Sequence, residues 1–215
     1  MLNYTRRSPH DRSLLMKLVG TKASPYVRKI RVILAEKNLP HEFVEESAWT
    51  ADTKVPTFNP LNKVPALVMD DGEAIYDSTV ISEYLDAISG GGLVPPDPAQ
   101  RARARRNEAL GNGLADAGIT ARLEGQRDKA KQEEAWIKRQ MGKVHAAIDA
   151  ISRHLGSQQY LGGARPNVGD IGCACALFWL EFRMPDIKWR ETHANLKGWA
   201  ERMESRPSFR ATIPS

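Results

Sequence analysis

Ser24 and Pro25 stand where a helix can begin and where a hydroxyl could do chemistry. The stretch GTKASPYVRK follows a short apolar run, and Val27, Ile30 and Leu34 then recur at the spacing of one helix face. Serine at the N-cap followed by proline at the first helical position is a favoured pair. A serine hydroxyl has two acceptor sites and one donor, so Ser24 can accept a helix amide proton and still donate its own. The sequence therefore predicts a helix cap that is also a hydrogen-bond donor at the positive end of a helix.

A second group of candidate residues flanks the clearest hairpin in the chain. The run VPALVMDDGEAIYDS places apolar segments on both sides of a DDG turn at 70–72, and Asp-Gly is a strong hairpin signal. Residues 63–65, Lys-Val-Pro, enter the first of these strands. Asp77 and Ser78 follow the second and predict the cap of a helix with an apolar face.

These segments belong to an α/β arrangement. MKLVG at 16–20 and HEFVE at 41–45 predict strands on either side of the Ser24 helix. The hairpin and its helix follow, which gives a β-α-β, β-β-α order. A parallel pair needs a crossover helix and an antiparallel pair can use a tight turn, so we expect a small mixed sheet with helices on its faces.

The second half of the chain is predicted to be entirely helical. The run SGGGLVPPDP breaks both periodicities and marks a linker. Four long helical patterns follow it, and NVGDIGCACALFWLEFRM is apolar nearly all round and is expected to be buried. We expect a loose N-terminal extension, an α/β domain, a linker and an all-α domain at residues 1–15, 16–89, 90–97 and 98–215.

Composition limits the possible functions. The chain has 215 residues, 41% of them hydrophobic, with a net charge of +5, which is ordinary for a globular protein and fits a solvated basic surface. No apolar run reaches the roughly 18–20 residues of a membrane span, and the first fifteen residues lack the apolar core of a signal peptide. We therefore expect a cytoplasmic protein that binds neither membranes nor nucleic acid. The run RARARR has no interleaved aromatic residues and predicts a solvated or subunit-facing helix surface formed by Arg101, Arg103, Arg105 and Arg106.

The remaining polar motifs favour structural roles. Asn167 and Asp170 have nearly the spacing of a capping box at the start of the buried helix. Cys173 and Cys175 lie two residues apart in that helix, which is not a zinc-ligand spacing, and we expect core thiols. His145 and His154 lie on an amphipathic helix without evident partners, so we interpret them as surface or structural residues.

The order of these motifs resembles the cytosolic glutathione transferases. The similar stretches are SPYVRKIRVILAEKNL, FNPLNKVPALV, the DS after the hairpin, and GLADAG. They look closest to the bacterial YibF-like subgroup, and serine before proline is similar to serine-type classes such as tau. The resemblance covers Met16 to about Phe209. It implies a thioredoxin-like first domain and an all-α second domain.

The resemblance also implies a glutathione site. Pro65 would follow a cis peptide bond, and the amide and carbonyl of Val64 would pair with the cysteinyl unit of glutathione like an added β bridge. Lys63 would reach the glycyl carboxylate. Asp77 would bind the γ-glutamyl ammonium, and Ser78 with the helix amides its carboxylate. The family often has Glu where Asp77 stands.

The implied activity is transfer of glutathione to a small electrophile. Ser24 would stabilise the glutathione thiolate, with glutathione as co-substrate and with no metal or permanent cofactor. The electrophile would lie between the first domain and the first long helix, where small residues at 113–118 either leave room for it or allow close helix packing. The candidates for this site are Tyr26, Trp49, Ala115, Ile119 and Arg122. The family is usually homodimeric.

Two other functions compete with this one. The chain could be a glutathione-binding or stress-regulatory protein of the same fold with little catalysis, and the positive charge fits that weakly. Thiol–disulfide exchange would require a cysteine where Ser24 stands. The sequence therefore argues against exchange.

Overall fold

The first half of the chain folds around a small mixed sheet with strand order β2-β1-β3-β4. The computed structural model describes residues 16–215, so the loose extension expected for residues 1–15 lies outside the described residues. The strands are β1 (Met16–Gly20), β2 (His41–Glu45), β3 (Ala66–Val68) and β4 (Ala74–Ile75). The other elements of this half are α1 (Pro25–Glu36), the 3-10 turn η1 (Val55–Thr57) and α2 (Ser78–Ile88).

The strand register brings three chain connections to one end of the sheet. β1 pairs in parallel with β2 through the α1 crossover and antiparallel with β3, and β3 and β4 form the predicted hairpin. Val19 lies opposite Ala66, and Leu67 lies opposite Ile75. The end of β1, the start of β3 and the end of β4 are therefore neighbours. The mixed sheet expected from the sequence is confirmed.

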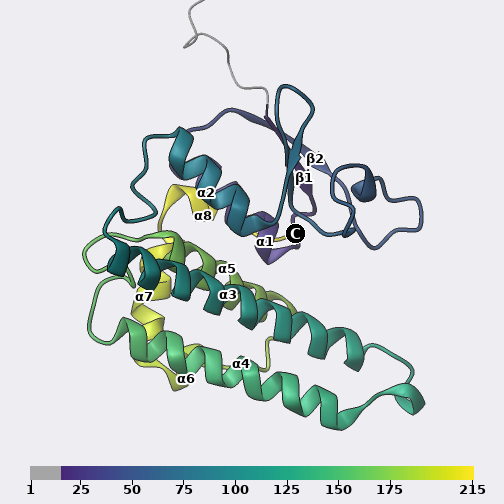
Figure 1. Cartoon of the computed structure of the whole chain (residues 1–215). Helices are drawn as coiled ribbons and strands as arrows, with labels where there is room; N and C mark the ends of the chain where they lie inside the picture. Colours follow the sequence, from purple (N-terminus) through teal and green to yellow (C-terminus); the bar gives the residue numbers. More distant parts are fainter. Residues whose placement is uncertain (1–15) are drawn as a thin grey trace, which may run out of the picture.

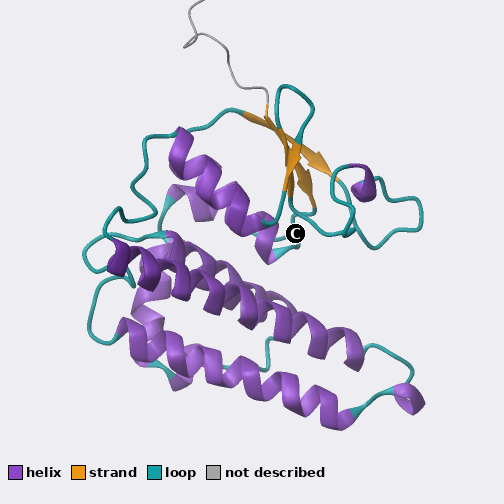
Figure 2. Cartoon of the chain, viewed as in Figure 1, coloured by secondary structure: helices purple, strands orange, loops and turns teal. Residues whose placement is uncertain are grey.

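The second half is helical, as predicted. Its elements are α3 (Pro98–Gly125), η2 (Lys129–Lys131), α4 (Glu134–Leu155), α5 (Val168–Arg183), α6 (Trp189–Thr192), α7 (Ala194–Glu204) and α8 (Pro207–Arg210). α3 and α4 run side by side as the two longest helices (Figure 1). α1 and α2 lie on the side of the sheet that faces these helices (Figure 2), and α1 packs directly against α5 and α8.

The last of the four predicted helices, THANLKGWAERMESRPSF at 192–209, forms two helices in the structure. α7 ends at Glu204 and α8 begins at Pro207, which occupies the first helical position of the new helix. A proline inside a helix removes a backbone donor and its ring clashes with the preceding turn, so the chain cannot continue straight through it. The single helix expected over this segment was therefore wrong at its end.

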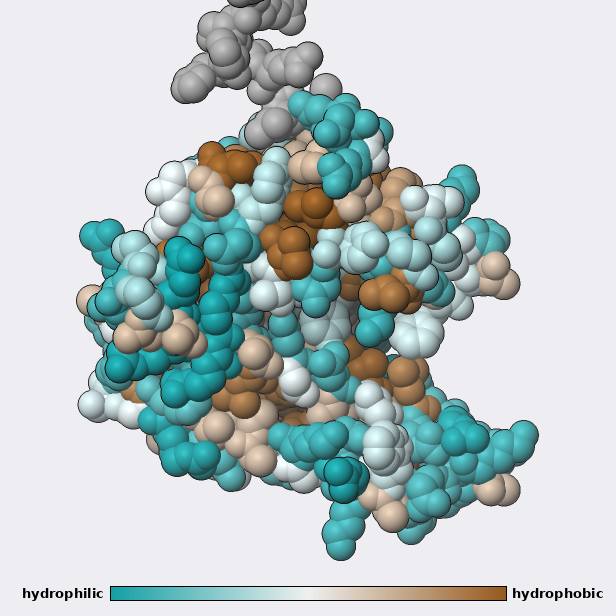
Figure 3. All heavy atoms as spheres, in the orientation of Figure 1, coloured by the Kyte–Doolittle hydropathy of each residue, from teal (hydrophilic) through white to brown (hydrophobic). Residues whose placement is uncertain are grey.

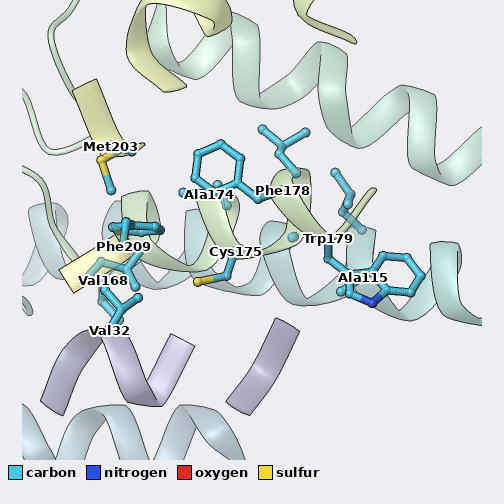
Figure 4. Packing of buried hydrophobic residues seen from close by; sticks show 14 of the residues in the cluster. Val32, Ala115, Val168, Ala174, Cys175, Phe178, Trp179, Met203 and Phe209 are labelled. Carbon is cyan, nitrogen blue, oxygen red and sulfur yellow. The ribbon is translucent and has the colours of Figure 1, made fainter. Parts of the chain in front are cut away.

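α5 is the centre of the core. Its residues from Val168 to Leu180 are buried, as its nearly uniform apolar sequence predicts. Cys173 and Cys175 are free and buried, and burial raises the pKa of the Cys175 thiol to about 11. Figure 4 shows Cys175 on α5, pointing to the opposite side of the helix from Phe178. The prediction of core thiols is confirmed.

The start of α5 is fixed by the predicted cap. The Asn167 side chain accepts the amide protons of Gly169 and Asp170 at 2.8 and 3.3 Å, and the Asp170 carboxylate accepts that of Asn167 at 3.0 Å. Asp170 also accepts a hydrogen bond from the Trp199 indole at 2.8 Å. The capping box is thus complete, and it also fastens α7 to α5.

His154 has a hydrogen-bond partner that was not evident from the sequence. Its Nδ1 lies 2.9 Å from Oδ1 of Asn107 on α3, and burial followed by the charge of Arg106 lowers its pKa. His145 is exposed, as expected. His154 is thus a structural residue, one of the two roles expected for it, and its partner was not evident because it is 47 residues away in the sequence.

Candidate functional site

Ser24 caps α1 at the end of the sheet where the three connections meet. Its side chain accepts the amide proton of Val27 at 3.3 Å, and Pro25 occupies the first turn of the helix. Within the part of the chain that the structure describes, the Ser24 hydroxyl makes no other hydrogen bond. The predicted cap is confirmed, and the hydroxyl proton is available to a group placed at the positive end of α1.

The end of β1, the first turn of α1 and the segment before β3 touch one another. A Cβ built on Gly20 would lie 2.4 Å from a methyl of Val27 and 3.3 Å from the Cβ of Val64. Real side chains do not tolerate the first of these distances, so this approach requires glycine. The glycine lets Val64 lie next to the start of α1, close to Ser24.

Val64 presents its backbone at this position. The Val64–Pro65 peptide bond is cis, as the family resemblance implies. None of the described residues forms a hydrogen bond to the amide or the carbonyl of Val64. Lys63 is exposed beside it, and its carbonyl accepts a hydrogen bond from Asn59 at 2.8 Å. The backbone of Val64 can therefore bridge to an extended peptide.

The N-terminus of α2 completes the site. Asp77 is the N-cap, and its carboxylate accepts the amide proton of Thr79 at 2.7 Å. Ser78 is the first residue of the helix and is buried. Asp77 is exposed, so its carboxylate caps the helix and also faces solvent. An acid, a hydroxyl and helix amides suit a ligand group that carries an ammonium beside a carboxylate.

Tyr26 ties the start of α1 to α3. Its hydroxyl donates a hydrogen bond to Asp116. Burial raises the pKa of Tyr26 well above its ordinary value, and the hydrogen bond to Asp116 and the charge of Asp77 add to the shift. Tyr26 therefore remains protonated as a donor. Asp116 was not singled out from the sequence, although it lies within the GLADAG stretch.

The other residues expected around an electrophile lie in different environments. Trp49 is 73% exposed, whereas Ala115 is 1% exposed and buried between helices. Ile119 packs at the edge of the core, and the Arg122 guanidinium donates a hydrogen bond to Gln126 at 3.1 Å. Figure 3 shows a hollow between the sheet-bearing half and the far ends of α3 and α4, with hydrophobic surface at its back.

The small residues of α3 serve helix packing in part. A Cβ at Gly118 would lie 2.9 Å from the ring of Trp179, so this glycine allows α5 to approach closely. Gly113 has no neighbour within 4 Å of a built Cβ among the described residues. The small residues at 113–118 were expected either to leave room for an electrophile or to allow close helix packing, and close packing explains Gly118.

A buried charged network lies behind the site. Lys29 of α1 and Glu108 of α3 form an ion pair of 2.9 Å, with both side chains 1% exposed. Ser82 of α2 and Arg105 of α3 also bind the Glu108 carboxylate, at 2.9 and 2.5 Å. The network joins the two helices that start at the site to α3. Lys29 and Glu108 were not predicted from the sequence because helical periodicity alone does not show that a charged residue is buried.

Arg105 is less exposed to solvent than was predicted for the RARARR run. Arg101, Arg103 and Arg106 are exposed, as predicted. Arg105 instead lies half-buried, in contact with Glu83 as well as Glu108. Arg105 is therefore not a freely solvated residue, because two carboxylates of its own chain bind it.

Metal-binding groups and membrane-spanning helices are both absent from residues 16–215. No group of three or more His, Cys, Asp and Glu side chains in this part of the chain could hold a metal ion. No helix in it is long and apolar enough to cross a membrane.

Comparisons with known proteins identify the family of this chain. The models for the N-terminal and C-terminal domains of glutathione S-transferases match residues 23–88 and 134–202. The uncharacterized GST-like protein YibF of Escherichia coli is 38% identical over 200 residues, covering 93% of this chain and 98% of YibF. A glutathione S-transferase of Methylobacterium radiotolerans, solved in complex with glutathione sulfonate, is 38% identical with a TM-score of 0.89, over 93% and 94% of the two chains.

A second solved structure is equally similar. A glutathione S-transferase of Methylobacillus flagellatus with glutathione bound is 35% identical with a TM-score of 0.90, over 93% of this chain and all of the other. The fold is a thioredoxin-like N-terminal domain joined to a helical C-terminal domain. These matches span nearly the whole described chain, and the protein belongs to the glutathione S-transferase family.

Proposed function

We propose that the protein conjugates reduced glutathione to a small, hydrophobic electrophile. The observation that carries this proposal is that Ser24, the N-terminus of α2 and the backbone of Val64, to which no described residue hydrogen-bonds, meet at one end of the sheet. The Methylobacterium radiotolerans and Methylobacillus flagellatus transferases, which bind glutathione sulfonate and glutathione, support glutathione as the ligand.

Each part of glutathione has a partner in this proposal. The cysteinyl unit pairs with the amide and carbonyl of Val64, which other described residues leave free. Lys63 binds the glycyl carboxylate. Asp77 binds the γ-glutamyl ammonium, while Ser78 and the amides of α2 bind the γ-glutamyl carboxylate.

The chemistry is nucleophilic attack by sulfur. A free cysteine thiol has a pKa of about 8.5, so little thiolate is present at neutral pH. The Ser24 hydroxyl and the positive end of α1 stabilise the thiolate, and the thiol proton passes to solvent. The sulfur then forms a bond to an electrophilic carbon, and the leaving group departs with its electron pair. The hollow beside α3 would hold the apolar part of the electrophile.

Calorimetry with reduced glutathione, followed by turnover of a generic aryl halide, tests the proposal. Binding with turnover is the expected result. Binding without turnover of any of a panel of electrophiles would favour a glutathione-binding regulatory protein. Absence of binding would overturn the proposal.

We also propose that the functional unit is a homodimer assembled through α2. Val80 is 51% and Ile88 39% exposed, and a shallow hollow beside Val80 is lined by Thr79, Tyr84 and Arg105. An apolar surface of this kind is typical of an interface. The substitution Val80→Asp should convert a dimer into monomers in sedimentation velocity, while Lys197→Asp, an exposed control on α7, should not. A wild-type monomer at micromolar concentration would contradict the proposal.

The cytoplasm is the location we propose, with a role in detoxification. Both cysteines are free thiols, which fits a reducing compartment. Cell fractionation of the producing organism would test the location. Recovery of the protein outside the cytoplasm would contradict it.

A further inference from the structure

Asp116 is an exposed residue of α3 whose carboxylate lies beside the start of α1. It accepts a hydrogen bond from the hydroxyl of Tyr26, which stands in the first turn of α1, two residues after Ser24. Among the described residues, Tyr26 is the one hydrogen-bond partner of this carboxylate, and no lysine, arginine or histidine side chain forms an ion pair with it. The carboxylate is therefore held in place without being neutralised.

The contacts of α3 place Asp116 relative to the parts of glutathione in the proposed site. One turn earlier on α3, the Asn112 side chain donates a hydrogen bond to the Thr79 hydroxyl at 3.2 Å. Asp77, which is proposed to bind the γ-glutamyl ammonium, caps the amide of the same Thr79. Asn112 thus marks the γ-glutamyl end of the site. Asp116 lies about 6 Å further along the helix, and its bond to Tyr26 shows that this direction leads toward the sulfur.

The next turn of α3 leads into the space proposed for the electrophile. Thr120 donates a hydrogen bond to the backbone carbonyl of Asp116 at 2.7 Å. Ile119 packs at the edge of the core, and Leu123 is 36% exposed. The far end of α3 borders the hollow whose back is hydrophobic (Figure 3). An electrophile that is joined to the sulfur and extends into this hollow would pass the Asp116 carboxylate.

The basic residues around Asp116 are distant or already paired. The nearest ones on α3 are Arg106 and Arg122, about 15 and 9 Å away along the helix axis. The Arg122 guanidinium is bound to a side chain one turn further out. Lys29 of α1 forms its ion pair with Glu108. The local field at Asp116 is therefore negative.

We propose that Asp116 is a specificity residue that selects electrophiles by charge, favouring cationic over neutral substituents and neutral over anionic ones. The inference rests on the proposed function, because an electrophile reaches Asp116 only when glutathione lies across Ser24, Val64 and Asp77. A unit charge on the electrophile interacts with the carboxylate by Coulomb's law. Since Asp116 is exposed, solvent and salt screen its charge, and the selection is modest in size.

Calorimetry of the full chain with three glutathione conjugates tests the inference without requiring turnover. The probes are the S-(para-carboxybenzyl), S-(para-carbamoylbenzyl) and S-(para-aminomethylbenzyl) derivatives, which are anionic, neutral and cationic at the same position. We expect the neutral conjugate to bind about fivefold more tightly than the anionic one, and the cationic conjugate about fivefold more tightly than the neutral one. Both ratios should fall toward one at an ionic strength of about 1 M.

Asp116→Asn removes the charge and keeps an oxygen that can accept the Tyr26 proton. This variant should bring both ratios below about twofold and leave the affinity for reduced glutathione within about twofold of wild type. Glu201→Gln is the matched control, because it removes an exposed carboxylate from α7. It should keep the wild-type ratios.

Reduced glutathione, titrated alone, distinguishes failure of the charge selection from failure of the proposed function. If it binds, the selection is overturned by wild-type ratios near one, by tighter binding of the anionic conjugate, or by ratios that Asp116→Asn leaves unchanged or that Glu201→Gln changes equally. The proposed glutathione site then stands. If reduced glutathione does not bind, the proposed function is overturned and the charge selection with it.

Discussion

Ser24 carries two roles on one oxygen. It accepts the Val27 amide proton as a helix cap, and in the proposed reaction it donates its own proton to the glutathione thiolate. A hydrogen bond to a charged group contributes about 1.5–3 kcal/mol, so Ser24→Ala should lower conjugation turnover about ten- to a hundredfold. The dissociation constant for glutathione should change by less than about threefold, since the other contacts remain.

Ser24→Thr is the control for this prediction. Threonine keeps a hydroxyl and is an acceptable N-cap, so it should retain most of the activity. Steady-state kinetics with an aryl halide and calorimetry with glutathione provide the two readouts. Unchanged turnover in Ser24→Ala would show that the helix amides, rather than the hydroxyl, activate the sulfur.

A substitution at Asp77 can remove the negative charge of the side chain and still keep the helix cap. Asn caps helices about as well as Asp, so Asp77→Asn should keep the hydrogen bond to Thr79 and leave the unfolding free energy within about 0.5 kcal/mol of wild type. It should weaken glutathione binding about tenfold by removing the negative charge opposite the γ-glutamyl ammonium. A dissociation constant equal to that of wild type would move the γ-glutamyl site elsewhere.

Single residues were predictable where their role is local. Ser24, Asp77 and Asn167 are caps, and a cap depends on neighbours within three residues. Tyr26 was expected beside an electrophile, yet its hydroxyl is bound by Asp116 from another helix, 90 residues away. No local pattern encodes such a pairing.

Two glycines of helix α3, Gly111 and Gly113, differ in their contacts with neighbouring helices. A Cβ at Gly111 would lie 2.7 Å from backbone atoms of Gly172 and Cys173 on α5, whereas nothing lies within 4 Å of one at Gly113 among the described residues. Gly111→Ala should destabilise the protein by about 1–3 kcal/mol because the helices must separate. Gly113→Ala should stabilise it by up to about 1 kcal/mol through helix propensity. Urea denaturation measures both, and equal effects would contradict the close packing.

Helices and strands whose apolar residues recur at a regular spacing were predicted correctly from the sequence. The hairpin and the long helices follow directly from apolar spacing and turn residues, as the DDG turn and the pattern of α4 illustrate. Sequence periodicity could not show which glycines of α3 face α5, because that depends on how two distant helices dock. The division between α7 and α8 was missed even though Pro207 signals it locally.

For the molecule as a whole, the Lys29–Glu108 pair joins the two halves. Removing one partner of a buried pair leaves an uncompensated charge and costs about 3–5 kcal/mol, whereas apolar replacement of both is far less costly. Lys29→Met should therefore destabilise strongly in urea denaturation. The double variant Lys29→Met/Glu108→Met should regain much of that loss, with Arg105 still bound to Glu83. A double variant no more stable than the single one would show that packing, and not charge, dominates here.

The segment predicted as a linker, residues 90–97, is held by hydrogen bonds at residues 91–94. Lys37 binds Asp86 at 2.9 Å and the carbonyl of Gly91 at 2.5 Å, and Asp86 accepts the amide protons of Leu93 and Val94 at 3.0 and 2.9 Å. The carbonyl of Leu93 in turn receives the first amide of α5 at 3.0 Å. Glycine and proline here end the helices without making the chain loose. The connection should therefore resist proteases until the entire protein unfolds, and the two halves should melt together in one calorimetric transition.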